Sequence, residues 1–330
     1  MPSKLKIAIL GVGPIGSLIS SALLQSRFDH ELFLIDQPYR IGQLAQHGLL
    51  IGDAQAVLFP REQLIDSLLQ LEHHPVDILC FCTKAYSLNT ILPLLKNKIS
   101  RSTLLISIQN GIDPENLISA SFPDNPVARM VVNFAGGLEG ENGKVLLNWF
   151  HPPNVIGLVN PGPADHQLEI LIEALSKGGL TTEKVPGVEM KKKAFYKAIL
   201  NSALSPLCAL TDLTMSQAMG PSCRPLVAQI LEEGLAVAHK LGFDYGPQAL
   251  TQCLGYLDKG GDHYPSMWHD LEANRLSEID FINGRIVELG RRFGVNVPHN
   301  YLLTALMVSK EIQAKTRLSE DMPAYLKMSQ

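Results

Sequence analysis

A glycine-rich turn near the start of the chain contains the first residues whose spacing could do chemistry. It reads GVGPIG over residues 11–16 and directly follows the apolar run of residues 7–10. Between a strand and a helix, such a turn binds the pyrophosphate of a dinucleotide, because the helix N-terminus presents unpaired N–H groups and a positive dipole end. The pattern therefore predicts a dinucleotide-binding βαβ unit. Its expected cofactor-binding residues are Gly11, Gly13, Pro14, Ile15 and Gly16.

The three glycines have separate physical roles, and their surroundings supply the context that the pattern needs. Gly11 permits the tight turn, Gly13 lets the backbone approach the pyrophosphate, and Gly16 lets helix and strand pack closely. The glycine pattern alone is weak evidence, since turns supply many false matches. Here a helical run follows the turn, and a second apolar strand over residues 31–35 ends at Asp36. An acid at this distance suits the ribose hydroxyls of a dinucleotide.

A second group of polar residues follows one face of a helix in the second half of the chain. Lys197, Asn201 and Ser205 are spaced i, i+4, i+8 within an otherwise apolar run. Residues at this spacing lie along one helix face. From the residues alone, two interpretations stay open: the stripe faces a ligand, or Lys197 only extends the exposed lysines at 191–193.

A third group lies further along the chain. Ser266 begins one helical run, and Glu278 stands beside an apolar stripe that extends from Ile279 to Phe293. The 3-4-3-4 spacing of this stripe is typical of a buried helix face. Taken alone, Ser266 is typical of a helix N-cap and Glu278 of a surface carboxylate. The residues by themselves favour these structural roles.

The elements that must position these residues differ between the two halves of the chain. In the first half, short apolar strands alternate with helical segments, as in a doubly wound sheet. Residues 76–82 and 104–108 are typical of buried strands, and Lys84 and Asn110 follow them. Ligands of open α/β sheets gather at the carboxyl ends of strands. Lys84 and Asn110 are therefore candidates for contact with cofactor or substrate.

Further periodicities give the domain organisation. Residues 61–72 have helical spacing, and residues 127–135 are typical of one strand. Past residue 187 the strand alternation ends and helical periods take over. We expect an α/β fold, with a Rossmann-type dinucleotide-binding domain at residues 1–186 and an all-helical substrate and catalytic domain at residues 187–330.

Composition and charge exclude several classes of protein. The chain has 330 residues, of which 46% are apolar and 18% charged, so it can bury a sizeable core and is not disordered. Its net charge of −4 gives no basic footprint for nucleic acid, and we find no apolar run of about 18 residues that would span a membrane. Five cysteines without regular spacing indicate neither a disulfide framework nor a metal site. We expect a cytoplasmic protein that binds no nucleic acid, membrane or metal.

Taken together, the motifs resemble the ketopantoate reductases (2-dehydropantoate 2-reductases). The resemblance covers nearly the whole chain, and its last two blocks are specific in order and separation, whereas the glycine turn is not. The family fold is a Rossmann domain followed by a helical domain, with the active site in the cleft between them. The motifs are the glycine turn, Thr83-Lys84-Ala85, Gln109-Asn110-Gly111, Lys197 with Asn201, and Ser266-Met267 followed by the run from Ser277 to Gly284.

The resemblance implies a role for each candidate in the helical half. Lys197 resembles the general acid that protonates the keto oxygen as nicotinamide delivers hydride. Glu278 resembles the residue that binds the substrate hydroxyl, orients Lys197 and helps to keep it protonated. Asn201 and Ser266 match residues that position the substrate, with Ser266 near the substrate carboxylate.

Two residues depart from the family pattern. The family commonly has a second asparagine where this chain has Ser205, and a shorter hydroxyl alters the substrate contacts on that side. NADPH-dependent members typically carry an arginine near the end of the second strand, whereas this chain has Asp36, which suits the ribose hydroxyls of NADH. Arg40 could swing in and bind the 2′-phosphate of NADPH. The cofactor is therefore expected to be NADPH or NADH, and Asp36 favours NADH.

The expected function follows from the resemblance. Asn110 matches the amide where nicotinamide and substrate meet, and Lys84 matches the lysine on the cofactor side. We expect NAD(P)H-dependent reduction of ketopantoate to pantoate, with Lys197 as general acid. The alternatives are a reductase of another small 2-oxo acid, or a nicotinamide-nucleotide-binding protein without turnover. The expected partner is a small 2-keto acid, and the family also allows a homodimer.

Overall fold

A computed structural model of the chain describes residues 4–140, 142–160, 164–321 and 323–326. Two compact units divide the chain. The first comprises Met1–Gln109 and Asp113–Lys191, and the second comprises Asn110–Ile112 and Lys192–Gln330. The functional division expected at residues 186–187 remains a prediction.

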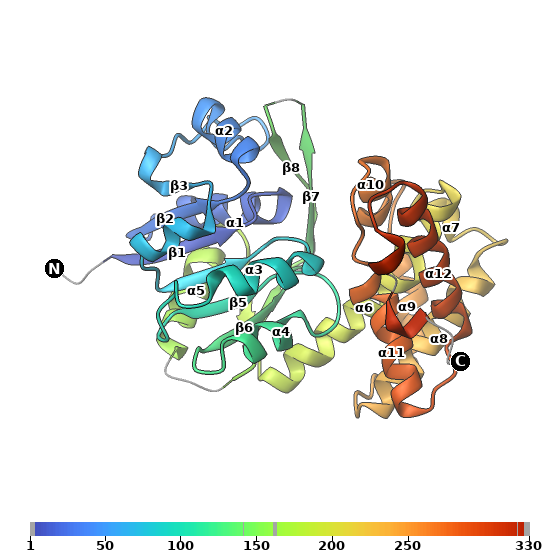
Figure 1. The fold of residues 1–330 in the computed structure, drawn as a ribbon. Coiled ribbons are helices and arrows are strands. Elements are labelled where there is room, and N and C mark those ends of the chain that lie inside the picture. The colour runs from blue at the N-terminus through green and yellow to red at the C-terminus, as the bar shows by residue number, and fades with distance from the viewer. Residues whose placement is uncertain (1–3, 141, 161–163, 322, 327–330) are drawn as a thin grey trace. The chain divides into compact units, whose positions relative to one another are not determined.

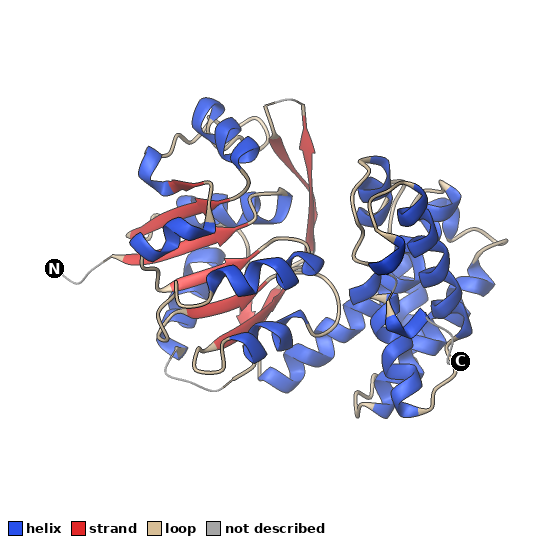
Figure 2. Cartoon of the chain, viewed as in Figure 1, coloured by secondary structure: helices blue, strands red, loops and turns tan. Residues whose placement is uncertain are grey.

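The first unit contains all the strands among the described residues (Figure 2). The strands are β1 (Leu5–Leu10), β2 (His30–Ile35), β3 (Leu64–Ile65), β4 (Ile78–Phe81), β5 (Leu104–Ser107), β6 (Val127–Val131), β7 (Phe134–Glu139), β8 (Lys144–Phe150), β9 (Asn154–Leu158) and β10 (Thr182–Lys184). The helices are α1 (Pro14–Gln25), α2 (Pro38–His47), α3 (Leu88–Leu95), α4 (Pro114–Ser121) and α5 (Asp165–Lys177), with short 3-10 turns η1 (Arg61–Gln63), η2 (Leu68–His73) and η3 (Ala85–Ser87).

Eight of these strands form one sheet in the order β3-β2-β1-β4-β5-β6-β9-β10 (Figure 1). All neighbouring strands are parallel except β6 and β9, while β7 and β8 form a separate hairpin. The order from β3 to β6 is that of a dinucleotide-binding doubly wound sheet. Leu10 lies opposite both Ile35 and Phe81, so β1, β2 and β4 end at one edge. The expected Rossmann-type domain is confirmed.

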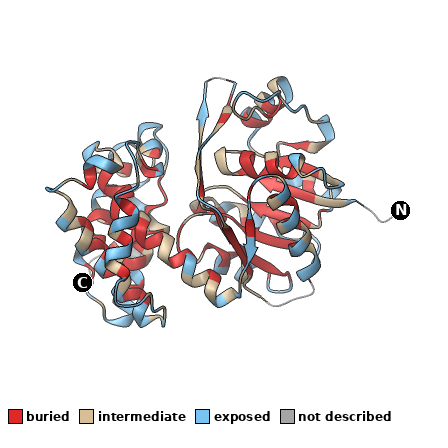
Figure 3. Cartoon of the chain, turned by 180° about the vertical axis from the view of Figure 1, so that it is seen from behind, coloured by how far each residue is buried: buried red, intermediate tan, exposed pale blue. Residues whose placement is uncertain are grey.

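Helices cover both faces of this sheet because its strands are apolar on both sides. Ile7 and Ile9 of β1 belong to a core with Leu168 of α5, which also includes side chains of α1. Ala8 and Leu10, on the opposite face, belong to a core with α3 and α4. Figure 3 shows the strands of the sheet as buried. The alternation along one short strand thus specifies a three-layer unit.

The second unit contains helices and no strand among its described residues, as expected. Its first helix, α6, begins in the first unit at Gly187 and continues through Lys192 into the second. The elements are α6 (Gly187–Thr211), α7 (Met215–Ala218), α8 (Arg224–Lys240), α9 (Ala249–Leu257), α10 (Ser266–Glu272), α11 (Asn283–Phe293) and α12 (Pro298–Gln313), with 3-10 turns η4 (Ile279–Phe281), η5 (Ser319–Asp321) and η6 (Ala324–Leu326).

Two local expectations were wrong, and a third was wrong in part. Within the segment 61–72, expected as a helix, two residues form the edge strand β3 beside β2, because tertiary pairing outweighed the helical spacing. The strand expected over residues 127–135 breaks between β6 and β7, which belong to different sheets. The stripe from Ile279 to Phe293 is buried as expected at Ile279, Ile282, Ile286 and Leu289, but it is divided between η4 and α11, and Phe293 at its end is 37% exposed.

Three composition-based expectations concern cysteines, membranes and metals. The five cysteines are unpaired. In the described part of the chain no helix has the length and apolar character to cross a bilayer. The same residues contain no cluster of three His, Cys, Asp or Glu side chains suited to a metal ion.

Candidate cofactor and catalytic residues

The glycine turn in the first unit has the geometry that its sequence predicts. Gly11 has a φ of +96°, which favours glycine. A Cβ on Gly11 would lie 2.6 Å from the backbone nitrogen of Thr83, so the turn also brings the residue before Lys84 against the end of β1. A Cβ on Gly16 would lie 2.0 Å from the carbonyl oxygen of Gly11. Both glycines are therefore required for the close packing of the turn.

Gly13 differs from its neighbours because nothing lies within 4 Å of the place where its Cβ would be. It is the N-cap of α1, no side chain caps that helix, and Pro14 occupies its first turn. The first N–H groups of a helix need partners, and an uncapped N-terminus beside open space suits a pyrophosphate. These residues fit a dinucleotide.

Asp36 lies at the end of β2 and is joined to the glycine turn. Its Oδ2 accepts a hydrogen bond from the Val12 nitrogen at 2.6 Å, and its Oδ1 accepts one from the Gln37 nitrogen at 2.7 Å. A carboxylate can accept about four hydrogen bonds, so acceptor positions remain for ribose hydroxyls. Asp36 therefore holds the backbone of the glycine turn through Val12 and places a carboxylate beside that turn.

Arg40 is 9% exposed, and its guanidinium group is directed to backbone and side chains of the first unit. Nε donates to the Val12 carbonyl at 2.9 Å, Nη1 donates to the Gly143 carbonyl at 3.3 Å, and Nη2 donates to Ser17 Oγ at 3.4 Å. Burial lowers the pKa of Arg40, and the nearby Asp36 charge opposes that shift. Reaching a 2′-phosphate would require breaking these contacts, so the sequence-based expectation that Arg40 swings toward the cofactor remains a prediction.

A chain of polar contacts continues from Thr83 through the sheet. Gln109 Nε2 donates to Thr83 Oγ1 at 3.4 Å, and Ser107 Oγ donates to Gln109 Oε1 at 3.1 Å. Arg129 Nη1 donates to Ser107 Oγ at 2.8 Å and lies 3.6 Å from Glu115, both side chains being almost fully buried. These residues hold the carboxyl ends of β4 and β5. Sequence reasoning missed Arg129, although a charge within the apolar β6 could have identified it.

In the second unit, the polar stripe of α6 becomes more buried along its length. Lys197 and Asn201 are half-buried, whereas Ser205 is 6% exposed. Alanines and large apolar residues of α6 flank them in the core. Lys191 and Lys192 have the same intermediate exposure as Lys197, and only Lys193 of that run is exposed, so burial does not separate Lys197 from the lysine run.

Pro206 follows Ser205 inside α6 and removes a backbone donor from the helix. The carbonyl left without that donor belongs to Ser202, and the buried Asn283 side chain donates to it at 2.9 Å. Asn283 is the first residue of α11, and one residue, Ile282, separates it from η4. It thus joins the helix of Lys197 to the segment of Glu278. Sequence reasoning missed this role, for which the buried proline was the signal.

Glu278 is the N-cap of η4 and is 3% exposed, so it is not the surface carboxylate that its neighbours suggested. Its Oε2 lies 3.5 Å from Asn110 Nδ2, although the two residues are 168 positions apart. Asn110–Ile112 belongs to the helical unit, where the Ile112 nitrogen donates to the Phe281 carbonyl at 2.8 Å. The Gln109-Asn110-Gly111 motif and the Glu278 motif therefore meet.

Ser266 is the first residue of α10, and its N-cap is Pro265 rather than Ser266. It is exposed. Beside it, Trp268 stacks on Tyr264 with centroids 3.9 Å apart and donates from Nε1 to Asp212 at 2.6 Å. Burial lowers the pKa of the neighbouring His269. A substrate role for Ser266 remains a prediction.

The fold and these residues define a class: an oxidoreductase with a dinucleotide-binding sheet and a helical second unit. The family model "Ketopantoate reductase PanE/ApbA" matches residues 7–158, and the model "Ketopantoate reductase PanE/ApbA C terminal" matches residues 189–311. The chain belongs to the ketopantoate reductase family.

Individual relatives agree with this assignment. A 2-dehydropantoate 2-reductase of Streptococcus pyogenes is 27% identical over 317 residues, covering 92% of this chain and 97% of that protein. The crystal structure of a ketopantoate reductase from Ralstonia eutropha has a TM-score of 0.81 at 25% identity, covering 94% of this chain and 100% of that one. A ternary structure of D-mandelate dehydrogenase with NADH and anilino(oxo)acetate has a TM-score of 0.78 at 27% identity, with 95% and 100% covered.

Proposed function

We propose that this protein reduces a small 2-keto acid, ketopantoate first, to the 2-hydroxy acid with a reduced nicotinamide dinucleotide. The observation that carries the proposal is the approach of Asn110 to Glu278 at 3.5 Å inside the helical unit. This contact brings two motifs that are 168 positions apart in sequence together around a carboxylate that is 3% exposed.

The chain's own residues would bind the keto acid and supply the proton. Lys197 would donate a proton to the keto oxygen, where negative charge develops, and a cationic donor lowers that barrier both as acid and as charge partner. Glu278 would accept a hydrogen bond from the substrate hydroxyl and favour the charged form of Lys197. Asn201, Ser266 and, in place of the family's second asparagine, Ser205 would position the substrate.

The cofactor would be held by residues of the first unit, together with Asn110 of the second. The N-terminus of α1 at Gly13 would bind the pyrophosphate, Asp36 the ribose, and Lys84 and Asn110 the nicotinamide side. When bound, the reduced nicotinamide supplies the hydride. The Asp36 charge disfavours a 2′-phosphate, and the buried Arg40 is committed to other contacts, so we infer a preference for NADH.

A second candidate is the reduction of a bulkier 2-oxo acid. The similarity to D-mandelate dehydrogenase, together with the short buried hydroxyl of Ser205, favours this alternative. The two candidates share the same hydride and proton chemistry and differ only in the substrate pocket.

The test is the loss of absorbance at 340 nm with ketopantoate, run in parallel with NADH and NADPH, and repeated with phenylglyoxylate. Rapid oxidation with ketopantoate supports the first candidate, and oxidation only with phenylglyoxylate supports the second. Tight cofactor binding without oxidation by any keto acid would reject both and favour a binding protein without turnover.

A further inference from the structure

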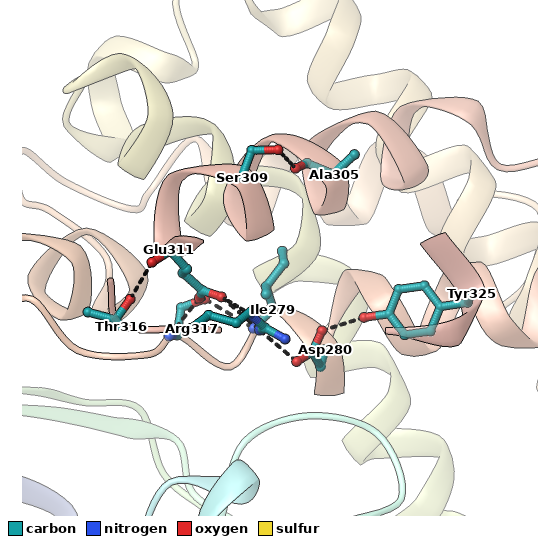
Figure 4. Close-up of polar contacts among 9 residues, drawn as sticks. Ile279, Asp280, Ala305, Ser309, Glu311, Thr316, Arg317 and Tyr325 are labelled. Atoms are coloured by element: carbon teal, nitrogen blue, oxygen red, sulfur yellow. Dashed lines mark hydrogen bonds and ion pairs between the residues drawn. The ribbon is translucent and has the colours of Figure 1, made fainter. Parts of the chain in front are cut away.

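A network of charged residues joins the end of α12 and the segment after it to the turn that contains Glu278 (Figure 4). Its central residue, Arg317, lies between two carboxylates. Arg317 Nε donates to Glu311 Oε2 at 2.7 Å, and Arg317 Nη2 lies 2.7 Å from Asp280 Oδ2. Tyr325 donates a short hydrogen bond from its hydroxyl to Asp280 Oδ1.

The same network reaches the other side of Glu278 through Ser277. Glu311 Oε1 accepts hydrogen bonds from the Ser277 nitrogen at 2.9 Å and from Ser277 Oγ at 2.6 Å. Ser277 Oγ in turn accepts a bond from the Ile279 nitrogen at 3.3 Å. Glu278 therefore lies between Ser277, which is bonded to Glu311 of α12, and Asp280, which is bonded to Arg317 and Tyr325 beyond that helix.

Burial makes these anchors strong. The Glu311 side chain is 0% exposed and that of Arg317 is 8% exposed, so the pair is shielded from competing water. Burial alone would lower the pKa of Arg317, but the charges of Asp280 and Glu311 raise it. Burial and the Asp280 charge also raise the pKa of Tyr325, which keeps its hydroxyl a donor.

The network extends beyond the part of the chain that defines the family. The family model ends at residue 311, the position of the buried glutamate, so Arg317 and Tyr325 lie past it. Nothing in the proposed chemistry requires these two residues to touch substrate or cofactor.

We propose that Glu311, Arg317 and Tyr325 are positioning residues that hold the 277–281 turn and thereby aim Glu278. This inference rests on the proposed function of Glu278. A carboxylate that orients a substrate loses rate when it moves by a fraction of an ångström, so the anchors should act on turnover rather than on cofactor affinity.

Two variants loosen the anchors by different amounts. Tyr325→Phe removes only the hydroxyl that donates to Asp280, and Glu311→Gln places an amide donor against Ser277 or Arg317. We expect faster amide hydrogen exchange at residues 277–281 in both variants. For the keto acid, kcat/KM should fall by about tenfold, while the Kd for NADH changes by less than about twofold.

Glu233→Gln is the matched control for Glu311→Gln. Glu233, 9% exposed, accepts hydrogen bonds at the other end of α12 from the backbone and side chains of His299 and Asn300. Each substitution therefore damages a buried carboxylate that holds one end of α12, Glu233 from α8 and Glu311 from α12 itself, but only Glu311 adjoins the Glu278 turn. Both are assayed well below their Tm.

The outcomes separate positioning from general destabilisation. The proposal is supported if Glu311→Gln loses turnover while Glu233→Gln, with a similar loss in Tm, keeps kcat/KM within about twofold of the parent. Equal activity in these two variants, or unchanged exchange at residues 277–281, would overturn it. If Glu278→Gln keeps parental turnover, the proposed role of Glu278 fails instead, and the exchange rates alone still decide whether the anchors hold the turn.

Discussion

At the scale of single residues, Lys197 and Glu278 combine a side chain that can carry charge with partial or nearly complete burial. Lys197 is half-buried on an apolar helix, and Glu278 is 3% exposed beside Asn110. Burying a carboxylate is unfavourable unless it is hydrogen-bonded or paired. The roles proposed above for Lys197 and Glu278 would account for this burial.

Replacing Lys197 by alanine should abolish most turnover without loss of the fold. Because a general acid contributes about 10²–10⁴ in rate, we expect kcat to fall by that factor, measured as NADH oxidation with saturating keto acid. Lys193→Ala, four residues earlier on an exposed position of the same helix, is the control. A parental rate in Lys197→Ala would exclude this residue as the acid.

Asp36→Asn should raise the use of NADPH relative to NADH. The asparagine keeps an oxygen that can accept from Val12 but removes the charge that repels a 2′-phosphate. Like charges forced together cost several kcal/mol, so we expect the ratio of kcat/KM values to shift by at least about tenfold. An unchanged ratio would show that the Asp36 charge does not select the cofactor.

At the scale of elements, two local devices shape the candidate site. The glycine turn packs β1 tightly against α1, and the Asn283 side chain replaces the donor that Pro206 removes from α6. Both features depend on backbone groups. Each is tested by a pair of substitutions, of which one is expected either to leave stability unchanged or to restore stability that the other removes.

Gly13→Ala and Gly16→Ala should separate cofactor binding from folding. The Cβ at position 13 meets open space, so we expect stability to change by less than about 0.5 kcal/mol while NADH affinity falls by about tenfold or more. The Cβ at position 16 would strike the Gly11 carbonyl, so this variant should lose about 1–3 kcal/mol or fail to fold. Urea unfolding and NADH titration measure the two effects. Normal NADH affinity in Gly13→Ala would argue against a pyrophosphate at this turn.

Asn283→Ala should destabilise the second unit because the Ser202 carbonyl loses its donor. A buried unsatisfied carbonyl costs about 1–3 kcal/mol. Pro206→Ala restores a backbone N–H at this turn of α6, so it should recover part of that loss in the double variant. The double-mutant cycle is measured by urea unfolding. Additive losses would mean that the two residues are not coupled.

At the scale of the whole molecule, the residues proposed to bind the cofactor and those proposed to act on the substrate lie mostly in different units. The residues expected to hold the dinucleotide lie in the first unit, except Asn110, whereas Lys197, Asn201 and Glu278 lie in the second. Neither unit contains the full set of residues that the proposed reaction needs. Activity should therefore depend on the integrity of both.

Alkaline pH should weaken the fold through buried thiols in both units. Burial raises the pKa of Cys80 in the first unit and of Cys208 in the second to about 12. Unfolded thiols ionise near pH 8.5, so the folded state keeps protons that the unfolded state releases as pH rises above this value. Stability from these groups is full below about pH 8.5 and declines toward pH 12, by about 1.4 kcal/mol per pH unit for each thiol.

Guanidinium unfolding at several values between pH 8.5 and pH 10 measures this dependence. Cys80→Ala should reduce the slope by about the share of one thiol, and Cys80→Ala combined with Cys208→Ala should reduce it by about twice as much. Equal slopes in all three proteins would show that the thiols do not contribute.

The sequence predicted the elements whose signals are local. The glycine turn, the alternation of β1 and the end of strand periodicity near residue 187 each reflect short-range rules of backbone conformation and burial, so the fold class followed from them. The edge strand β3 has only two residues, and its pairing with β2 is a tertiary effect that no local period reveals.

The candidate site was predictable only in part. Lys197 and Asn201 share a helix face by spacing, but the meeting of Asn110 with Glu278 depends on how distant segments pack. The contacts of Arg40 and the anchors at Arg317 likewise depend on which neighbours surround each charge. The sequence shows that Arg40 and Arg317 are charged, whereas the packing of the fold determines which groups these side chains contact.

The three-residue segment Asn110–Ile112 affects how this protein can be divided. Because it folds with the helices while its neighbours on both sides fold with the sheet, the chain passes from one unit to the other at residues 109–110, 112–113 and 191–192. A recombinant fragment beginning at residue 192 would lack Ile112, whose side chain is 4% exposed in the helical core. It would also lack the Ile112 N–H group that donates a hydrogen bond to the Phe281 carbonyl. Such a fragment would expose the apolar side chains that Ile112 covers, and it would tend to aggregate. Gene fusion or domain exchange at α6 alone would therefore separate the helical unit from a part of its own interior.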